Sequence, residues 1–295
     1  ALLLKNIQPE NRVYRYNAFR NNCSTRPLDL YFETLSLPPD LKGTLDMVAL
    51  HFDDQNSHYL RPTTWRQVIN ALEAGSPWLV LGTDLAMGSE LDQTMHPLER
   101  LFIPTDAAEI LATSSYGRMG ATDTVWLKPC EQYIKTEGAP ATPRGGFNFT
   151  HPLIVFSLLL ILCLTIYALR ARGWKIYGIL EFLIYLVAGL GGCLLFYISF
   201  FSEHPMVFPN WNLLALHPGY LVLAVLMPFG SRTMQVRRII SMVLLIPLVA
   251  FPIVALGVGQ VINPSVYLIA VSLFVLCLGR VGWFPSFLMP LPTLP

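Results

Sequence analysis

The sequence predicts an exported α+β domain followed by an α-helical membrane bundle of about five transmembrane helices. The chain of 295 residues is 53% hydrophobic and 13% charged, with a mean hydropathy of +0.48. Residues 1–150 contain 13 Lys and Arg against 17 Asp and Glu, whereas residues 151–295 contain 7 against 2. The long uncharged runs all lie in the second part. These observations exclude a disordered chain, a nucleic-acid binder and an ordinary cytosolic enzyme.

Five runs in the second part can cross a bilayer, because about 20 apolar residues span a hydrocarbon core of about 30 Å. They are 152–169, 177–201, 213–229 and two within 239–279, the last two joined by a turn at 257–264. Glu181 interrupts the second run near its start. Its carboxylate is expected to reach the headgroup region instead of the bilayer centre.

Positive charges between the predicted spans set the orientation, because short cytoplasmic loops retain Lys and Arg. These charges fall in the first and third connections: Arg170, Arg172 and Lys175, then Arg232, Arg237 and Arg238. The second and fourth connections have none. We therefore expect residues 1–137 to form the exported domain, 138–150 a linker rich in Gly, Pro and Thr, and 151–295 the membrane domain with a cytoplasmic carboxyl terminus.

The pattern within the exported domain predicts helices at 28–37, 65–74 and 104–111 and strands at 122–128 and 132–136. Thr63 and Thr64 are available to cap the second helix. The segment 82–88 is expected to be a structural turn and not a phosphate-binding loop, because it lacks the required spacing and lysine. Residues 1–5 lack the features of an export signal, so we expect a signal peptide upstream.

The five cysteines fall into two groups. Cys163, Cys193 and Cys277 lie within predicted spans, where a thiol behaves as a small apolar residue. Cys23 and Cys130 lie in the exported domain and could form a disulfide in an oxidising compartment. Neither a C-x-x-C nor an H-x-x-x-H spacing occurs, so neither a metal nor another cofactor is expected.

Cys23 has neighbours that favour a reactive thiol. It precedes a predicted helix whose first turn must include Pro27, because proline is tolerated there and not deeper. The positive end of the helix dipole and the charges of Arg20 and Arg26 both favour a thiolate. In the alternative interpretation Cys23 is buried, and its polar neighbours only cap the helix: Asn22, Ser24 and Thr25.

Four motifs occur in order along the exported domain: Y-R-Y-N-A-F-R-N-N-C-S-T-R-P-L-D at 14–29, T-W-R-Q-V-I at 64–69, P-W-L-V-L-G-T-D-L-A-M-G at 77–88 with Asp92, and E-R-L-F-I-P at 99–104. Together they resemble the membrane-anchored lipoprotein N-acyltransferases of the Lnb type. The similarity continues through the spans, including His204 with Pro205 and the segment 210–214. The family is related in pattern to permuted papain-like thiol enzymes, so the resemblance implies a partial fold of that kind for the exported domain.

The resemblance implies acyl transfer through a thioester at Cys23, from a phospholipid to the α-amino group of a lipoprotein's amino-terminal diacylglyceryl cysteine. Residues around the nucleophile would support its turn: Asn22, Thr25, Arg26 and Asp29. Residues of the second connection, which is expected outside the membrane, could contact lipid or substrate: His204, Asn210 and Trp211. For His204 the alternative is anchoring at the membrane interface. The implied setting is the bacterial inner membrane, with the catalytic domain in the periplasm and no cofactor or nucleic acid involved.

The family's histidine, which would act as general base, is expected upstream of residue 1. The resemblance therefore implies that residues 1–295 alone lack half of the catalytic dyad. Two other functions stay open. One is a membrane-anchored thiol peptidase or amidase of the cell envelope that uses the same Cys23. The other is a non-catalytic membrane scaffold.

Overall fold

The computed structural model describes residues 2–34, 48–51, 59, 61–113, 115–118, 124–126, 149–173 and 177–285. The chain divides into two compact units. The first, here the N-terminal unit, comprises Ala1–Trp65 and Gln93–Ala141. The second, here the bundle unit, comprises Arg66–Asp92 and Thr142–Pro295. The segment 66–92, which the sequence assigned to the exported domain, thus clusters with the membrane helices.

The N-terminal unit combines short helices with two small sheets. Its elements are α1 (Leu2–Asn6), α2 (Thr25–Thr34), β1 (Val48–His51), β2 (Thr63–Thr64), β3 (Thr94–Met95), the 3₁₀ helix η3 (Pro97–Phe102), α6 (Pro104–Thr113), β4 (Ser115–Arg118) and β5 (Thr124–Trp126). The three-stranded sheet has the order β1-β4-β5. Both of its pairings are antiparallel, with Leu50 opposite Tyr116 and Tyr116 opposite Val125.

Several predicted elements of this unit are confirmed, with shifted bounds. The helix predicted at 28–37 is α2, the one predicted at 104–111 is α6, and β5 lies within the strand predicted at 122–128. Thr63 and Thr64 form β2, which pairs with β3 and directly precedes α4, and their role as a cap stays a prediction. The linker at 138–148 and the strand predicted at 132–136 lie outside the described residues.

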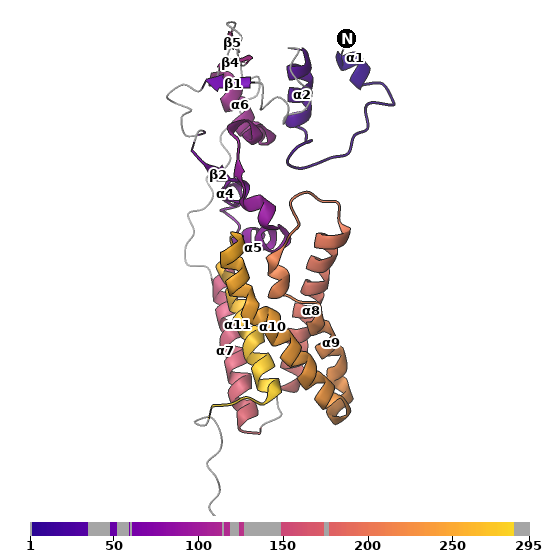
Figure 1. Ribbon diagram of the computed structural model, residues 1–295, viewed down its shortest axis with the longest axis vertical. Coiled ribbons are helices and arrows are strands. Elements are labelled where there is room, and N and C mark those ends of the chain that lie inside the picture. Colours follow the sequence, from indigo (N-terminus) through magenta and orange to yellow (C-terminus); the bar gives the residue numbers. More distant parts are fainter. Residues whose placement is uncertain are drawn as a thin grey trace, which may run out of the picture. The chain divides into compact units, whose positions relative to one another are not determined.

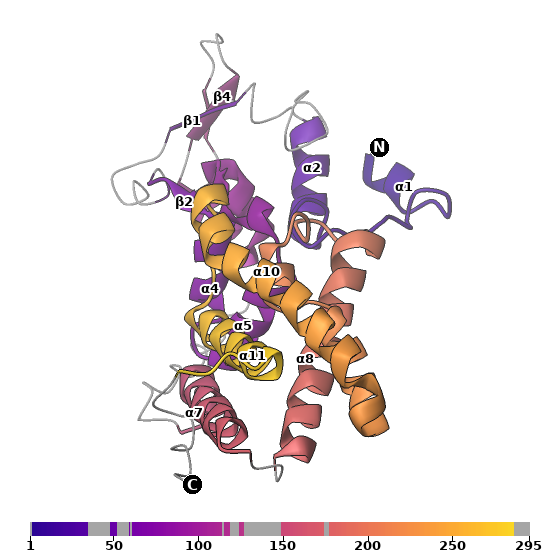
Figure 2. The same cartoon turned by 60° about the horizontal axis from the view of Figure 1, so that its bottom comes forward.

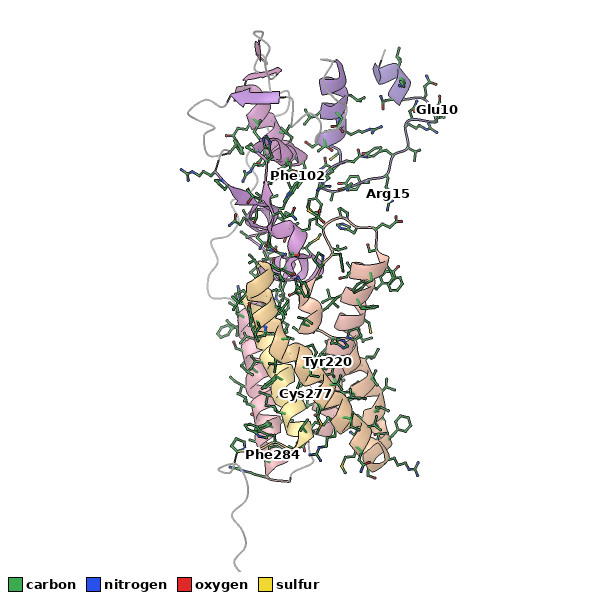
Figure 3. The ribbon with its side chains drawn as sticks, in the orientation of Figure 1. Glu10, Arg15, Phe102, Tyr220, Cys277 and Phe284 are labelled. Atoms are coloured by element: carbon green, nitrogen blue, oxygen red, sulfur yellow. The ribbon has the colours of Figure 1, made fainter. Side chains whose placement is uncertain are left out.

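The core of the N-terminal unit is an aromatic cluster. The ring centroids of Phe19 and Trp65 are 5.6 Å apart in an edge-on arrangement, and those of Trp65 and Phe102 are 5.2 Å apart. Leu101 and Ile110 beside them are fully buried. Such edge-on and tilted pairs add specific geometry to the burial of apolar area. Figure 3 labels Phe102 within this cluster of side chains.

The bundle unit contains the long helices. They are α7 (Pro152–Ala171), α8 (Gly178–Phe201), the 3₁₀ helix η4 (Trp211–Leu214), α9 (Gly219–Leu226), the 3₁₀ helix η5 (Met227–Thr233), α10 (Met234–Val258) and α11 (Pro264–Val281). In Figure 1 α7 and α8 run along the bundle, and α10 crosses it obliquely. Figure 2 shows α11 between α7 and α10. Side chains facing away from the bundle are apolar and exposed, such as Val187 at 69% and Ile246 at 69%, as expected of helices that face lipid.

Four helical segments of the described chain are long and apolar enough to cross a membrane: Pro152–Ala171, Gly178–Phe201, Trp211–Val258 and Pro264–Val281. The third has 48 residues, about 72 Å if straight and far more than one crossing requires. Gly230 interrupts it with non-helical angles, φ 58° and ψ −133°, and α9 and α10 lie side by side. The third predicted span, 213–229, contributes an α-helix of eight residues, because Pro218 and Pro228 supply no N–H for a longer one.

Two glycines allow α8 to approach α9 closely. A Cβ added at Gly189 would lie 2.2 Å from the backbone nitrogen of Leu221, and one added at Gly192 would lie 2.7 Å from the carbonyl carbon of His217. Close approach at small residues is the usual way in which membrane helices gain van der Waals contact. Figure 3 labels Tyr220 and Cys277, two fully buried side chains of this core.

The segment 66–92 forms α4 (Trp65–Leu72, of which residue 65 belongs to the N-terminal unit), α5 (Pro77–Ala86) and the 3₁₀ helix η2 (Ser89–Asp92). α4 confirms the helix predicted at 65–74. The prediction of a turn at 82–88 is wrong, because Gly82 lies inside α5 and the helix continues to Ala86. Trp78 fixes α5 at the start of α7, since its indole N–H donates to the Thr150 carbonyl at 2.6 Å.

Candidate functional site

Cys23 lies in the turn that begins α2, and Asn22 fixes the start of that helix. The Asn22 side-chain oxygen accepts hydrogen bonds from the backbone N–H groups of Ser24 at 2.8 Å and Thr25 at 2.9 Å. The Asn22 carbonyl accepts the first helical hydrogen bond, from the Arg26 N–H at 3.0 Å. The Thr25 hydroxyl in turn accepts a hydrogen bond from the Asn22 N–H at 2.8 Å. Asn22 is therefore the N-cap, and Cys23 is the first residue after it.

The same turn is tied to η3, which lies far along the chain. The Asn22 side-chain nitrogen donates to the Phe102 carbonyl at 2.9 Å, across 80 residues of sequence. The Ser24 hydroxyl donates to the Leu101 carbonyl at 2.7 Å. Asn22 is 5% exposed and Thr25 is fully buried. The side chains of Asn22, Ser24 and Thr25 thus fix the turn both to the start of α2 and to η3.

Cys23 itself is exposed and is a free cysteine. The interpretation in which it is buried is therefore wrong, although its neighbours do cap the helix as that interpretation required. The other described cysteines lie within long apolar helices, as predicted: Cys163 in α7, Cys193 in α8 and Cys277 in α11. Cys163 and Cys277 are fully buried, and Cys193 is half-buried. Cys130 lies outside the described residues.

Arg26 and Asp29 both lie on α2. The Arg26 guanidinium donates to the Asn6 side chain at 3.3 Å, and its central carbon lies 5.0 Å from the centroid of the Tyr14 ring. Arg26 thereby links the nucleophile turn to the segment that precedes it, through a hydrogen bond and a cation–π contact. Asp29 is half-buried one turn further along the helix. The role of these two residues in supporting the nucleophile turn stays a prediction.

The bundle unit contains a second polar cluster, which sequence reasoning did not identify. Arg66 is 1% exposed, and its guanidinium binds two buried carboxylates. Nη1 donates to Asp84 at 2.8 Å, while Nε and Nη2 donate to the two oxygens of Asp92 at 2.8 and 3.1 Å. Nη2 also donates to the Gly88 carbonyl at 3.0 Å. We call Arg66, Asp84 and Asp92 the buried triad.

Two amide side chains donate further hydrogen bonds to the buried triad. Asn70 donates to Oδ1 of Asp84 at 3.2 Å, and Asn263 donates to Oδ2 of Asp84 at 3.0 Å. Burial raises the pKa of Asp92, against the hydrogen bonds from Arg66 that lower it. Burial would lower the pKa of Arg66, but its hydrogen bonds with the two carboxylates raise it overall. Arg66 is therefore a permanent cation that balances buried carboxyl groups.

The loop 202–218, here called the outer loop after its predicted side of the membrane, lies against the end of α5. Asn210 is 5% exposed, and its side-chain nitrogen donates to the Leu85 carbonyl at 2.7 Å. Asn212 is 1% exposed and donates to the Asp84 carbonyl at 2.8 Å. The Gly88 N–H donates to the Met206 carbonyl at 2.8 Å, and a Cβ at Gly88 would lie 2.4 Å from the Pro209 carbonyl oxygen. The loop and α5 thus fit together only with a glycine at position 88.

The three outer-loop residues predicted to contact lipid or substrate have different surroundings. Asn210 is used within the protein, as described above. His204 is exposed, and one ring nitrogen lies 2.9 Å from the Pro205 carbonyl oxygen. Trp211 is half-buried, and its backbone N–H donates to Gln260 at 3.0 Å. Contact of these residues with lipid stays a prediction.

The expected position of the Glu181 carboxylate at the headgroup level stays a prediction. Glu181 is 1% exposed, and its carboxylate forms ion pairs with Arg170 and with Arg280, the latter at 2.8 Å.

Within the described part of the chain, no group of three His, Cys, Asp or Glu residues is placed to hold a metal ion.

Residues 145–281 match the family described as the Lnb transmembrane domain. No curated protein and no solved structure matches the chain. The matched residues run from just before α7 to the end of α11, and so contain all four membrane-capable segments. The membrane part of this chain is therefore an Lnb-type transmembrane domain.

Proposed function

We propose that the protein is a lipoprotein N-acyltransferase that uses Cys23 as its nucleophile. The observation that carries the proposal is an exposed, free thiol directly after the N-cap of α2, in a chain whose membrane part is an Lnb-type domain. An exposed thiol in a turn held by Asn22, Ser24 and Thr25 is accessible yet fixed in position. Such positioning contributes to rate because it removes much of the entropy cost of bringing the reacting groups together.

In the first step the Cys23 thiolate attacks the carbonyl carbon of an acyl ester in a membrane phospholipid. The sulfur–carbon bond forms, the ester carbon–oxygen bond breaks, and the lysophospholipid leaves as an alcohol after taking up a proton. The acyl chain is then held as a thioester on Cys23. A thiolate is a good nucleophile, and the thioester divides one difficult transfer into two easier ones.

In the second step the α-amino group of a lipoprotein's amino-terminal diacylglyceryl cysteine attacks the thioester. The carbon–nitrogen bond forms, the carbon–sulfur bond breaks, and the amine proton passes to a general base. Cys23 leaves as the thiolate with which the cycle began. Asn22, Thr25, Arg26 and Asp29 act as supporting residues of the turn, and His204 and Trp211 contact lipid or substrate from the outer loop.

The proposal places the N-terminal unit on the periplasmic side of the bacterial inner membrane and the carboxyl terminus in the cytoplasm. The distribution of Lys and Arg between the spans supports this orientation. Both substrates carry their acyl chains in the outer leaflet, so a catalytic domain attached to a membrane bundle meets them at that surface.

The experiment compares Cys23→Ser with Cys193→Ser in cells that depend on the full-length protein. Cys193 is a half-buried thiol of α8 and serves as the matched control. Mass spectrometry of lipoprotein amino termini should show triacylated cysteine with the wild type and with Cys193→Ser, and only diacylated cysteine with Cys23→Ser. A purified wild-type enzyme should also carry an acyl group on Cys23 that hydroxylamine releases.

Two results would point to the other functions. If Cys23→Ser cells still contain triacylated lipoproteins, Cys23 does not carry the transfer and the scaffold is favoured. If the wild type releases a free carboxylate from a cell-wall peptide and never becomes acylated, the peptidase is favoured.

A further inference from the structure

A pocket of about 750 Å³ lies at the end of the bundle where α7 and α11 finish and α8 and α10 begin. Five elements line it: α7, α8, η5, α10 and α11. Its volume is in the range of small-molecule sites. The pocket belongs to neither the Cys23 turn nor the buried triad.

The charge of the pocket is unbalanced. Its lining includes Arg170, Arg237 and Arg280, but Glu181 is its one acidic lining residue among those the structure describes. Glu181 pairs with Arg170 through one carboxylate oxygen and with Arg280 through the other. Arg237 instead donates from Nη2 to the Gly230 carbonyl at 2.6 Å. Among the described lining residues, three cations and one anion leave two surplus positive charges.

Two guanidinium donors in the pocket have no acceptor among the residues that the structure describes. The Nε atoms of Arg237 and Arg280 are buried and make no hydrogen bond within the described ranges of the chain. The Arg280 side chain is 9% exposed. Buried polar atoms in folded proteins are normally satisfied, so unused donors on converging arginines indicate a place for an acceptor. An anion with several oxygens suits these planar donors best.

The pocket also has an apolar wall that is open to the surroundings. Ile179 and Met234 line it and are 76% and 63% exposed. Ile179 belongs to the first turn of α8 and Met234 begins α10, both of which continue along the apolar outer surface of the bundle. A ligand with an anionic head and hydrocarbon chains could therefore place its head among the arginines and its chains along these helices.

The depth of the pocket agrees with such a ligand. α11 has 18 residues between its cap Asn263 and Gly282, about 27 Å of helix, which is close to the hydrocarbon thickness of about 30 Å. Arg280 is at the end of this helix, and Arg170 is at the end of α7. The arginines therefore lie at the level where phospholipid phosphates occur.

We propose that this pocket binds the phosphate group of an anionic phospholipid, with Arg237 and Arg280 as its principal donors. The recognised chemistry is a phosphate oxyanion, which could come from a lipid headgroup or from free phosphate. The exposed apolar wall favours the lipid. The site stands apart from the proposed chemistry at Cys23 and does not depend on it.

The test uses Arg237→Gln, with Arg238→Gln as the matched control. Both remove one positive charge from the same turn of α10, but Arg238 is exposed and does not line the pocket. The full chain is placed in nanodiscs of equal phosphatidylglycerol and phosphatidylcholine, and native mass spectrometry measures which lipid stays bound. We expect the wild type and Arg238→Gln to retain phosphatidylglycerol preferentially. Arg237→Gln should lose about ten-fold of that preference, since one charge-assisted hydrogen bond contributes about that much.

A second variant removes the risk that Arg237→Gln merely disturbs folding. Ser231 is an exposed lining residue, so Ser231→Asp adds a negative charge while every arginine stays in place. It should weaken phosphatidylglycerol binding about as much as Arg237→Gln. Equal losses in Arg237→Gln and Arg238→Gln, or no loss in Arg237→Gln and Ser231→Asp, would overturn the proposal.

Inorganic phosphate distinguishes the two sources of the anion. Millimolar phosphate added to the nanodiscs should leave the retained phosphatidylglycerol unchanged, because it cannot use the apolar wall. If phosphate displaces the lipid completely and binds the lipid-free protein with the same dependence on Arg237, the lipid assignment is wrong.

Discussion

The bundle unit has two charged clusters, one at each end of α11, and they use their charges differently. At the start of α11, the buried triad places one arginine between two carboxyl groups, and Asn263 and Asn70 supply further donors to Asp84. At the other end, three arginines share Glu181, and the Nε atoms of two of them have no acceptor among the described residues. A cluster with its hydrogen bonds made internally contributes to structure. A cluster with surplus donors contributes to binding.

The arginines of the two clusters also differ in how deeply they are buried. Arg66 is 1% exposed, and it uses Nε, Nη1 and Nη2 within the protein. Arg237 is half-buried beside an open pocket. Removing an arginine should therefore destabilise the fold at the start of α11 and weaken anion binding at its end.

The largest effect is expected for Arg66→Ala. This change leaves Asp84 and Asp92 buried without their cation, which typically costs about 3–5 kcal/mol of folding free energy. Thermal unfolding of the full chain in detergent, followed by circular dichroism, measures the loss. Arg61→Ala is the control because Arg61 is exposed. Similar unfolding temperatures for the two variants would show that the triad is not what stabilises this end.

A smaller effect is expected for Gly88→Ala, which tests the fit between α5 and the outer loop. The added Cβ would lie 2.4 Å from the Pro209 carbonyl oxygen, so backbone must move, at a cost of about 1–3 kcal/mol. Gly82→Ala is the matched control because a Cβ there has no neighbour within 4 Å. As an alanine inside a helix it should stabilise the protein by up to about 1 kcal/mol. Opposite shifts in unfolding temperature are expected, and a shift of the same sign in both variants would contradict the packing described.

The smallest effect is expected for the stability of Arg237→Gln in the absence of lipid. It removes a surplus positive charge from beside Arg170 and Arg280, so the free energy of unfolding should change by less than about 1 kcal/mol. The same unfolding assay measures it, in lipid-free detergent. A loss as large as that of Arg66→Ala would mean that the two clusters serve the same structural purpose.

The Cys23 turn was predictable because its interactions are local. Asn22, Thr25 and Pro27 lie within five residues of one another, and each has a known preference at a helix start. The prediction placed the helix three residues too late, since the cap is Asn22 and α2 begins at Thr25. The sequence did not decide whether the Cys23 thiol is exposed, and the structure shows that it is.

The buried triad was not predictable because its partners are distant in sequence. Arg66 meets Asp84 across 18 residues and Asp92 across 26, and Asn263 meets Asp84 across 179. The one signal was a lone aspartate in the otherwise uncharged helix P-W-L-V-L-G-T-D-L-A, since a buried charge requires a partner. The ion pair of Glu181 with Arg280 was missed for the same reason, because Arg280 lies 99 positions further along the chain.

Asn263 acts in two directions at once. Its side-chain oxygen accepts a hydrogen bond from the Ser265 N–H and so starts α11, while its side-chain nitrogen donates to Asp84 on α5. α11 therefore cannot shift along its own axis unless α5 moves with it or the hydrogen bond from the Asn263 amide to Asp84 breaks. The Asn263 side chain thus fixes the axial position of α11 relative to α5, a short helix that begins nearly two hundred residues earlier.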